Sequence, residues 1–167
     1  MPLNRSIMEQ LAVSEDELLR QLDTDVITIF STMVGIEVTQ PSTQTESHSK
    51  FSDCVTAMVG LVGVYNGLIT ISATRKQAAT FATSMLGLDD VESSEVADAL
   101  GEIANMIGGS FKHHFIRDGR EVKLSTPSVI TGNEYDISAG SPPDTLTLLY
   151  AVGHEHFKVS VYLEAGV

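Results

Sequence analysis

The segment from residue 94 to residue 112 reads SEVADALGEIANMIGGSFK and has the periodicity of an amphipathic helix. Successive side chains of a helix are rotated by roughly 100°, so residues three or four positions apart share a face. The apolar side consists of Val96, Ala99, Leu100, Ile103, Ile107 and Phe111, and the polar side of Asp98, Glu102, Asn105, Gly109 and Lys112. We therefore expect a helix over about 92–115 that buries its apolar side and turns Glu102 and Asn105 outward.

The same helix carries three glycines, Gly101, Gly108 and Gly109, on or beside its polar face. Each glycine in a helix costs about 1 kcal/mol relative to alanine. The presence of three glycines despite this cost predicts that another group lies close to the helix backbone. A glutamate followed three residues later by an asparagine also occurs by chance on solvated helices, so this spacing alone does not define a site.

The residues around the pair are more specific. Asp98-x-x-x-Glu102-x-x-Asn105, within Ala-Leu-Gly-Glu-Ile-Ala-Asn-Met-Ile-Gly-Gly, resembles the signature of the CheC/CheX/FliY family of chemotaxis phosphatases. In that pattern a proline follows somewhat more than twenty residues downstream, and here Pro127 follows Asn105 with twenty-one residues between. The segment Ser14 to Met33 has no second Glu-x-x-Asn, and this single-motif arrangement resembles CheX rather than the two-motif CheC.

The resemblance implies a phosphatase that hydrolyses the phosphoaspartate of a CheY-type response regulator. Such an acyl phosphate is already activated, so catalysis consists mainly of positioning water. The Asn105 carboxamide can orient water but cannot act as a base near neutral pH. By the resemblance, Glu102 pairs with the regulator's active-site lysine and the regulator holds the Mg²⁺, so this chain needs no cofactor of its own. Residues expected to contact the regulator are Asp98, Gly101, Gly109 and Lys112.

Two alternatives compete with this interpretation. A binding module of the same fold could dock on a signalling protein through the same helix face without hydrolysing anything. A metal site could be imagined at His113-His114 or at His154 and His156, but these histidines lack carboxylates at matched spacing. Such histidines are typical of surface or capping positions, and we predict no metal site.

Composition narrows the class of protein further. The chain has 167 residues, 43% of them hydrophobic, which suits one domain over 1–167 with a real core. A formal net charge of -12 opposes binding to nucleic acid or to anionic lipid.

No apolar run reaches the roughly 20 residues of a membrane span, and the N-terminus lacks a secretory pattern, so we expect a cytoplasmic protein. Cys54, the single cysteine, excludes an internal disulfide and a cysteine-based zinc site.

The remaining patterns predict an α+β fold, with long helices packed on a mostly antiparallel sheet. Capping boxes at Ser14/Glu17 and Thr74/Gln77 and stops at Gly35 and Gly87 indicate two further helices. Strands are expected over 36–40, 52–64, 68–73, 120–130, 145–152 and 157–163, with Asn66-Gly67 forming a tight hairpin turn and Gly132 in a loop. The resemblance to CheX implies a homodimer, and strands 145–152 and 157–163 would suit pairing at a sheet edge.

Overall fold

The computed structural model describes residues 9, 14–39, 42–44, 49–63, 65–115, 122–137, 145–153 and 155–165. Its helices are α2 (Glu15–Ile29), the π-helical turn η1 (Phe30–Val34), α3 (Arg75–Leu86), α4 (Ser93–Lys112) and the 3-10 turn η2 (His113–Phe115). Its strands are β1 (Ser42–Gln44), β2 (Ser49–Gly63), β3 (Tyr65–Thr74), β4 (Val122–Leu124), β5 (Ser128–Ile137), β6 (Thr145–Val152) and β7 (Glu155–Ala165).

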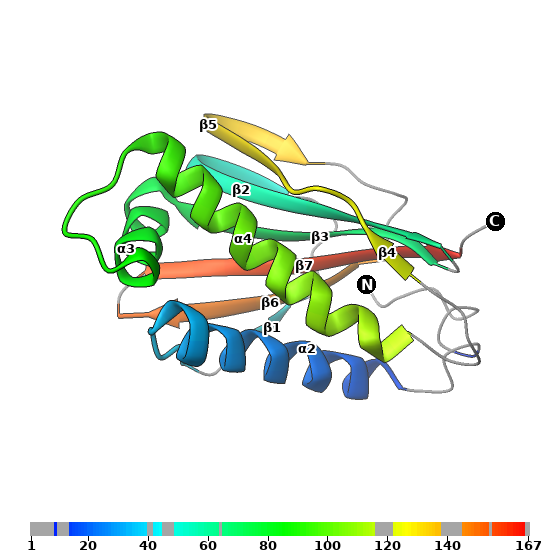
Figure 1. Ribbon diagram of the computed structural model, residues 1–167. Helices are drawn as coiled ribbons and strands as arrows, with labels where there is room; N and C mark the ends of the chain where they lie inside the picture. Colours follow the sequence, from blue (N-terminus) through cyan, green and yellow to red (C-terminus); the bar gives the residue numbers. More distant parts are fainter. Residues whose placement is uncertain are drawn as a thin grey trace.

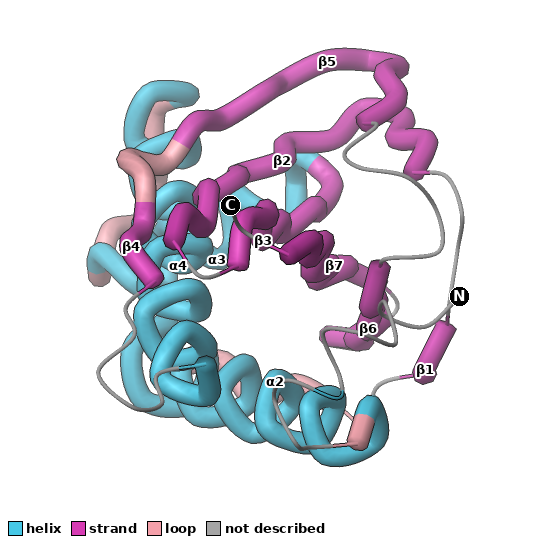
Figure 2. Tube along the Cα trace, turned by 90° about the vertical axis from the view of Figure 1, so that its right-hand side faces the viewer, coloured by secondary structure: helices cyan, strands magenta, loops and turns pink. Residues whose placement is uncertain are grey.

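The strands form one sheet in the order β1-β6-β7-β3-β2-β4, and β5 also pairs with β2. Every described strand pair is antiparallel. The helices gather on one side of the sheet, where α4 runs diagonally across the strands with α2 beside it (Figures 1 and 2). This arrangement confirms the predicted α+β fold with helices packed on an antiparallel sheet.

Four aromatic rings join the helices to the sheet at one end of the core. Phe30 of η1 stacks on Phe157 of β7 at 4.8 Å, and Phe81 of α3 meets both rings edge-on. Tyr150 of β6 also stacks on Phe157, with ring centroids 5.2 Å apart, and donates a hydrogen bond of 2.9 Å to Asp23 of α2. Burial and the neighbouring Asp23 raise the pKa of Tyr150, so its hydroxyl remains a donor at physiological pH.

The predicted helix ends are largely confirmed. Ser14 and Thr74 accept hydrogen bonds from the third residue of their helices, at 3.2 and 3.1 Å. Gly35 and Gly87 end their helices in the left-handed conformation, at φ 82° and 68°. The reciprocal bond of the second capping box is absent, because both polar atoms of the buried Gln77 amide lack a partner among the described residues. The last turn of the first helix is π-helical, which periodicity alone does not predict.

The hairpin between β2 and β3 differs from the prediction. Leu61 pairs with Gly67, so the turn is centred before Tyr65 and both Asn66 and Gly67 belong to β3. Asn66 still supports the turn, since its side-chain oxygen accepts a hydrogen bond of 3.2 Å from the Gly63 amide. A Cβ at Gly67 would overlap the carbonyl oxygen of Tyr162 on β7. Close approach between strands therefore explains this glycine.

The predicted strand 120–130 is interrupted. β4 ends at Leu124 and β5 begins at Ser128, and both pair with β2. Ser125 bridges the break, because its amide donates to the Gly60 carbonyl at 2.9 Å and its hydroxyl accepts from the Gly60 amide at 2.8 Å. β5 continues through Gly132, which is therefore in a strand rather than a loop. Residues 36–39 are not a strand, although Thr39 donates to the Ala151 carbonyl, and residue 40 lies outside the described residues.

Strands 145–152 and 157–163 are confirmed as strands, and they differ in how their edges are covered. β6 pairs with β1 and β7, and β7 pairs with β6 and β3. β7 therefore offers no free edge, contrary to the expectation, whereas β1 covers the outer edge of β6 only along Thr147–Leu149. Over the described residues β5 pairs only with β2, which leaves one of its own edges without a strand partner.

Gly67→Ala should lower the free energy of unfolding by about 2–3 kcal/mol, because the added methyl group must displace the Tyr162 carbonyl and disturb the pairing of β3 with β7. Gly109→Ala is the matched control. No heavy atom lies within 4 Å of its added Cβ, and alanine gains up to about 1 kcal/mol in helix propensity. Urea unfolding of the two variants measures both effects, and equal stability would contradict the close approach at Gly67.

Candidate functional site on α4

A hydrogen bond between Glu92 and Glu95 defines the start of α4. Glu92 is the N-cap, and its amide donates a hydrogen bond of 3.0 Å to the Glu95 carboxylate. From there the helix runs without interruption to Lys112, as predicted. Its predicted apolar residues are buried, apart from Val96, which is partly buried against the same core. The rotational setting of α4 is therefore determined by its apolar side.

Two of the three glycines pack against the chain's own strands. A Cβ at Gly108 would lie 3.3 Å from Leu124 and 3.6 Å from Val59, so α4 approaches β4 and β2 closely at this point. Gly101 is buried, and its added Cβ would lie 3.4 Å from Pro127 in the break between β4 and β5. Gly101 was predicted to contact the regulator, but the observed close approach comes from Pro127. Gly109 alone has open space beside it.

Glu102 and Asn105 are both exposed, as predicted. Side chains three positions apart on a helix have Cβ atoms about 5–6 Å apart, so one partner can contact both. Neither side chain has a hydrogen-bond or ion-pair partner in the part of the chain that the structure describes. The carboxylate can accept hydrogen bonds from a cation, and the carboxamide can donate and accept at the same time. Both groups are thus available to a second molecule.

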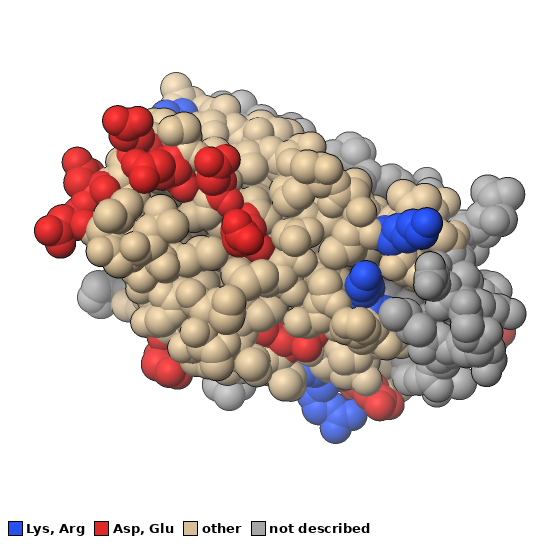
Figure 3. Space-filling model, in the orientation of Figure 1, with Lys and Arg blue, Asp and Glu red and all other residues tan. Residues whose placement is uncertain are grey.

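Charge is unevenly distributed along this face. Acidic side chains gather over the start of α4 and the loop before it, and basic side chains lie toward the other end of this face (Figure 3). The acidic residues of this stretch are Asp89, Asp90, Glu92, Glu95, Asp98 and Glu102. Lys112 lies in the last turn of the helix and is half-buried. A molecule lying along α4 would meet negative charge before Asn105 and positive charge after it.

The turn η2 that follows α4 contacts α2 through His114. The His114 Nε2 and Asp25 Oδ2 atoms are 3.0 Å apart, and both side chains are largely buried. Burial raises the pKa of the Asp25 carboxyl, and the hydrogen bond from His114 acts in the opposite direction. Residues 14–39, 49–63, 65–115 and the described strands after them contain no cluster of three metal-binding side chains. His154 lies outside the described residues.

Sequence reasoning did not assign a role to Pro127. Pro127 carries no amide hydrogen, which suits the break in the strand, and it lies close to α4 at Gly101, the residue before Glu102. The sequence signal that could have pointed to this role was the spacing of the proline after the Glu102/Asn105 motif.

Among the residues that the structure describes, no helix has the length and apolar character of a membrane span.

Comparison with known proteins places these features in a family. The model of the chemotaxis phosphatase CheX family matches residues 55–147, which include α4 and Pro127. The chain is 25% identical over 109 residues to the CheY-P phosphatase CheX of Thermotoga maritima, covering 64% of this chain and 70% of that protein. It is 32% identical to a CheX crystal structure from Desulfovibrio desulfuricans, with a TM-score of 0.74 and coverage of 89% of this chain and 99% of that one.

A third relative has been solved with a partner. CheX from Borrelia burgdorferi, crystallised as a CheX-CheY-BeF₃-Mg²⁺ complex, is 16% identical, with a TM-score of 0.73 and coverage of 88% of this chain and 97% of that one. At this identity the similarity concerns the fold alone. The family match and the Desulfovibrio structure together confirm the resemblance seen in the motif, and this chain belongs to the CheX family of chemotaxis phosphatases.

Proposed function

We propose that this protein hydrolyses the phosphoaspartate of a CheY-type response regulator, with Asn105 and Glu102 as its functional pair. One observation carries the proposal: both side chains are exposed and unpaired on α4 in a member of a phosphatase family. The Thermotoga relative is a CheY-P phosphatase, and the Borrelia relative forms a complex with CheY. Both support a phosphorylated regulator as the substrate.

In this mechanism Asn105 acts by position. Its carboxamide oxygen accepts a hydrogen bond from the attacking water, and its N–H group donates to a phosphoryl oxygen. Water is thereby held in line with the bond to be broken, and no strong base is needed for an acyl phosphate. Glu102, one turn earlier, pairs with the regulator's lysine and sets the position of Asn105 over the phosphoryl group. The regulator supplies the Mg²⁺, in keeping with the Mg²⁺ of the Borrelia complex.

The neighbouring residues would support docking. Gly109 has open space beside its backbone, so a regulator segment can approach the helix there. Lys112 places a positive charge beyond Asn105, on the side where phosphoryl charge would lie, and Asp98 extends the acidic side beyond Glu102. Gly101 is not included, because it is buried beneath Pro127.

Asn105→Ala should reduce the dephosphorylation rate at least about 100-fold, because misplacing the attacking water carries a cost of that size. The fold should be unaffected, since Asn105 is exposed and alanine favours helix. The lifetime of the phosphorylated regulator, with and without each protein, measures the effect and also tests the proposed function itself. Wild-type turnover by the variant would remove Asn105 from the mechanism, and an unchanged lifetime with the wild-type protein would favour a non-catalytic binding module.

Glu102→Ala should weaken regulator binding about tenfold by removing a charge-assisted hydrogen bond, which is about 1.4 kcal/mol. Glu102→Lys should weaken it further, because it places two like charges together. Glu37→Ala removes an equally charged, exposed glutamate outside α4 and should have no effect. Titration calorimetry at two salt concentrations measures the affinities, which should fall modestly with salt for the wild type. If Glu102→Ala binds like Glu37→Ala, the anchoring role is refuted.

We further propose that the protein forms a homodimer, as the resemblance to CheX implies. The free edge of β5 is a surface on which a second copy could add a strand. Light scattering at micromolar concentration should give about twice the chain mass of 18.0 kDa. A monomer mass with full activity would show instead that one chain contains the complete site.

A further inference from the structure

Gly109 is the glycine of α4 that the chain's own packing does not explain. Added Cβ atoms at Gly101 and Gly108 would lie 3.4 and 3.3 Å from the nearest side chains, but no heavy atom lies within 4 Å of one at Gly109. The φ of Gly109 is not positive, so no special backbone conformation requires glycine there. Glycine is also a poor helix former. The open backbone at Gly109 therefore suits the approach of a second molecule.

Met106 is the apolar side chain that α4 presents beside its functional pair. The residue follows Asn105, packs against the hydrophobic core and remains partly exposed. With a rotation of about 100° per residue, Met106 is about 40° from Glu102 around the helix. The one other apolar side chain of α4 within about 60° of Glu102 is that of Ala99, which is buried. A partner that covers Glu102 and Asn105 therefore also meets Met106.

The positions of these residues determine how firmly a partner can be oriented. Seen along the helix axis, Asn105 is about 60° to one side of Glu102, and Met106 is about 40° to the other. Two contacts leave a partner free to tilt about the line between them, and a third contact beside that line removes this freedom. Gly109 lies about 20° from Glu102 and one turn beyond Asn105, so a partner that contacts all three side chains passes over it.

The composition of this part of α4 is that of the centre of a protein interface. From Ile103 to Phe111 the helix carries no charged residue, whereas acidic residues precede this stretch and Lys112 follows it. Figure 3 shows the same arrangement as an uncharged area between acidic and basic side chains. The centres of protein interfaces are depleted in charge and enriched in methionine, and their rims are polar. The charged ends of α4 thus flank an uncharged centre that contains Met106 and Gly109.

We propose that Met106 is a positioning residue for the reaction: a segment of the response regulator beside the phosphoaspartate passes over Gly109 and rests on Met106. This inference rests on the proposed function, because the segment belongs to the same partner. The contact sets the tilt of the regulator, and with it the distance between the Asn105 carboxamide and the phosphoryl group. Core contacts already hold Met106, so less side-chain freedom is lost on binding than for a fully exposed methionine.

The methyl groups of the methionines report this contact directly. In protein labelled with ¹³C at these methyl groups, the Met106 signal should shift when a CheY-type regulator carrying beryllofluoride and Mg²⁺ is added. Met58 of β2 is the matched control, because it is also partly exposed and its neighbours Ala57 and Val59 point into the core. Successive side chains of a strand point to opposite faces, so Met58 faces away from α4 and its signal should not move. Met106→Leu and Met58→Leu assign the two signals.

Met106→Ala should weaken binding of the beryllofluoride-loaded regulator about tenfold, because it removes apolar area that the regulator covers. It should also lower kcat with the phosphorylated regulator about tenfold, because the tilt of the regulator is no longer fixed. Met106→Leu keeps an apolar side chain of similar volume and should remain within about threefold of the wild type in both. Met58→Ala should change neither quantity. Calorimetry measures the affinities, and thermal melting followed by circular dichroism checks folding.

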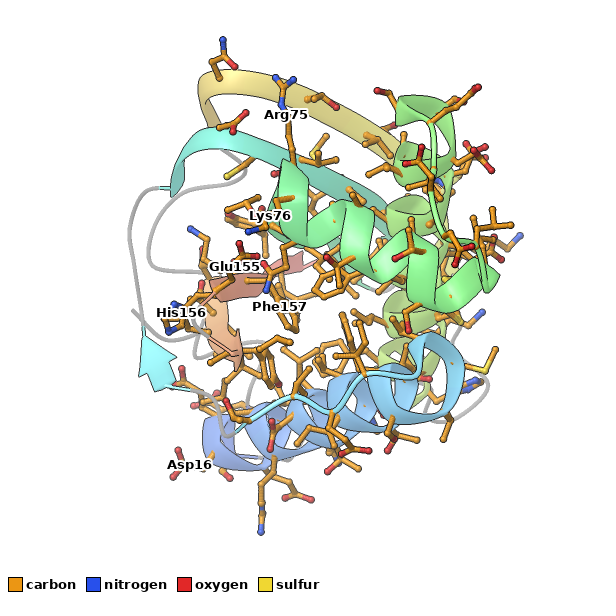
Figure 4. The ribbon with its side chains drawn as sticks, turned by 90° about the vertical axis from the view of Figure 1, so that its left-hand side faces the viewer. Asp16, Arg75, Lys76, Glu155, His156 and Phe157 are labelled. Carbon is orange, nitrogen blue, oxygen red and sulfur yellow. The ribbon has the colours of Figure 1, made fainter. Side chains whose placement is uncertain are left out.

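Gly109→Ala separates binding from stability, because its two expected effects have opposite directions. The variant should unfold at a higher urea concentration than the wild type, since alanine favours helix and the added methyl group meets no other atom. It should nevertheless bind the regulator about tenfold more weakly, because the methyl group occupies the path of the regulator segment. Lys76→Ala is the control for contacts elsewhere and should bind like the wild type. Lys76 is exposed at the start of α3, near Glu155 and His156 of β7 (Figures 1 and 4).

The outcomes distinguish this inference from the proposed function. Binding of the loaded regulator without turnover by the wild type would refute the phosphatase function, while the Met106 signal would still decide on the contact. Turnover with an unshifted Met106 signal, or with an equal shift at Met58, would refute the contact alone. Unchanged affinity of Gly109→Ala would refute the passage of the segment over Gly109. If Met106→Ala does not fold, the methyl signal and Gly109→Ala decide, and absence of any binding would refute both proposals.

Discussion

The close packing of α4 on the sheet is the constraint on which the rest of the structure depends. Gly108 brings the helix against Leu124 and Val59, and Gly101 brings it against Pro127. A larger side chain at Gly108 would push the helix away from β2 and β4 or rotate it. Since successive residues are about 100° apart, even a modest rotation would carry Glu102 and Asn105 toward a neighbouring surface. The glycines thus allow the close packing in which the apolar side of α4 is buried and Glu102 and Asn105 face outward.

The break between β4 and β5 completes this arrangement. If residues 120–130 formed one continuous strand beside α4, its backbone would be paired along its whole length. Proline would not fit in such a strand, because it has no amide hydrogen to donate. Ser125 replaces part of the missing ladder through its two hydrogen bonds with Gly60, and Pro127 then lies over Gly101. The irregular segment is therefore tied to β2 by hydrogen bonds, and it lies close to α4 at the residue before Glu102. Rigid support of this kind suits a site that acts by positioning.

Local patterns predicted the elements whose determinants lie close together in the chain. The apolar spacing of α4 and the caps Ser14 and Thr74 are such determinants, and so is the alternation in β6 and β7. The prediction failed where contacts between residues far apart in the sequence determine the local structure. Asn66-Gly67 resembles a turn locally, but the approach of β7 at Tyr162 places it in a strand. The exposed pair of α4 could be found because both residues lie on one helix, three positions apart.

The lack of partners for Glu102 and Asn105 has a consequence for how such a protein can evolve. The core is held by apolar side chains and backbone pairing, and it receives no support from either polar group. Natural selection on folding therefore does not protect this pair, and only selection on activity preserves it. If a lineage no longer needs the reaction, it can lose these two polar residues and keep the fold. Relatives with this architecture can accordingly diverge in function far faster than in shape.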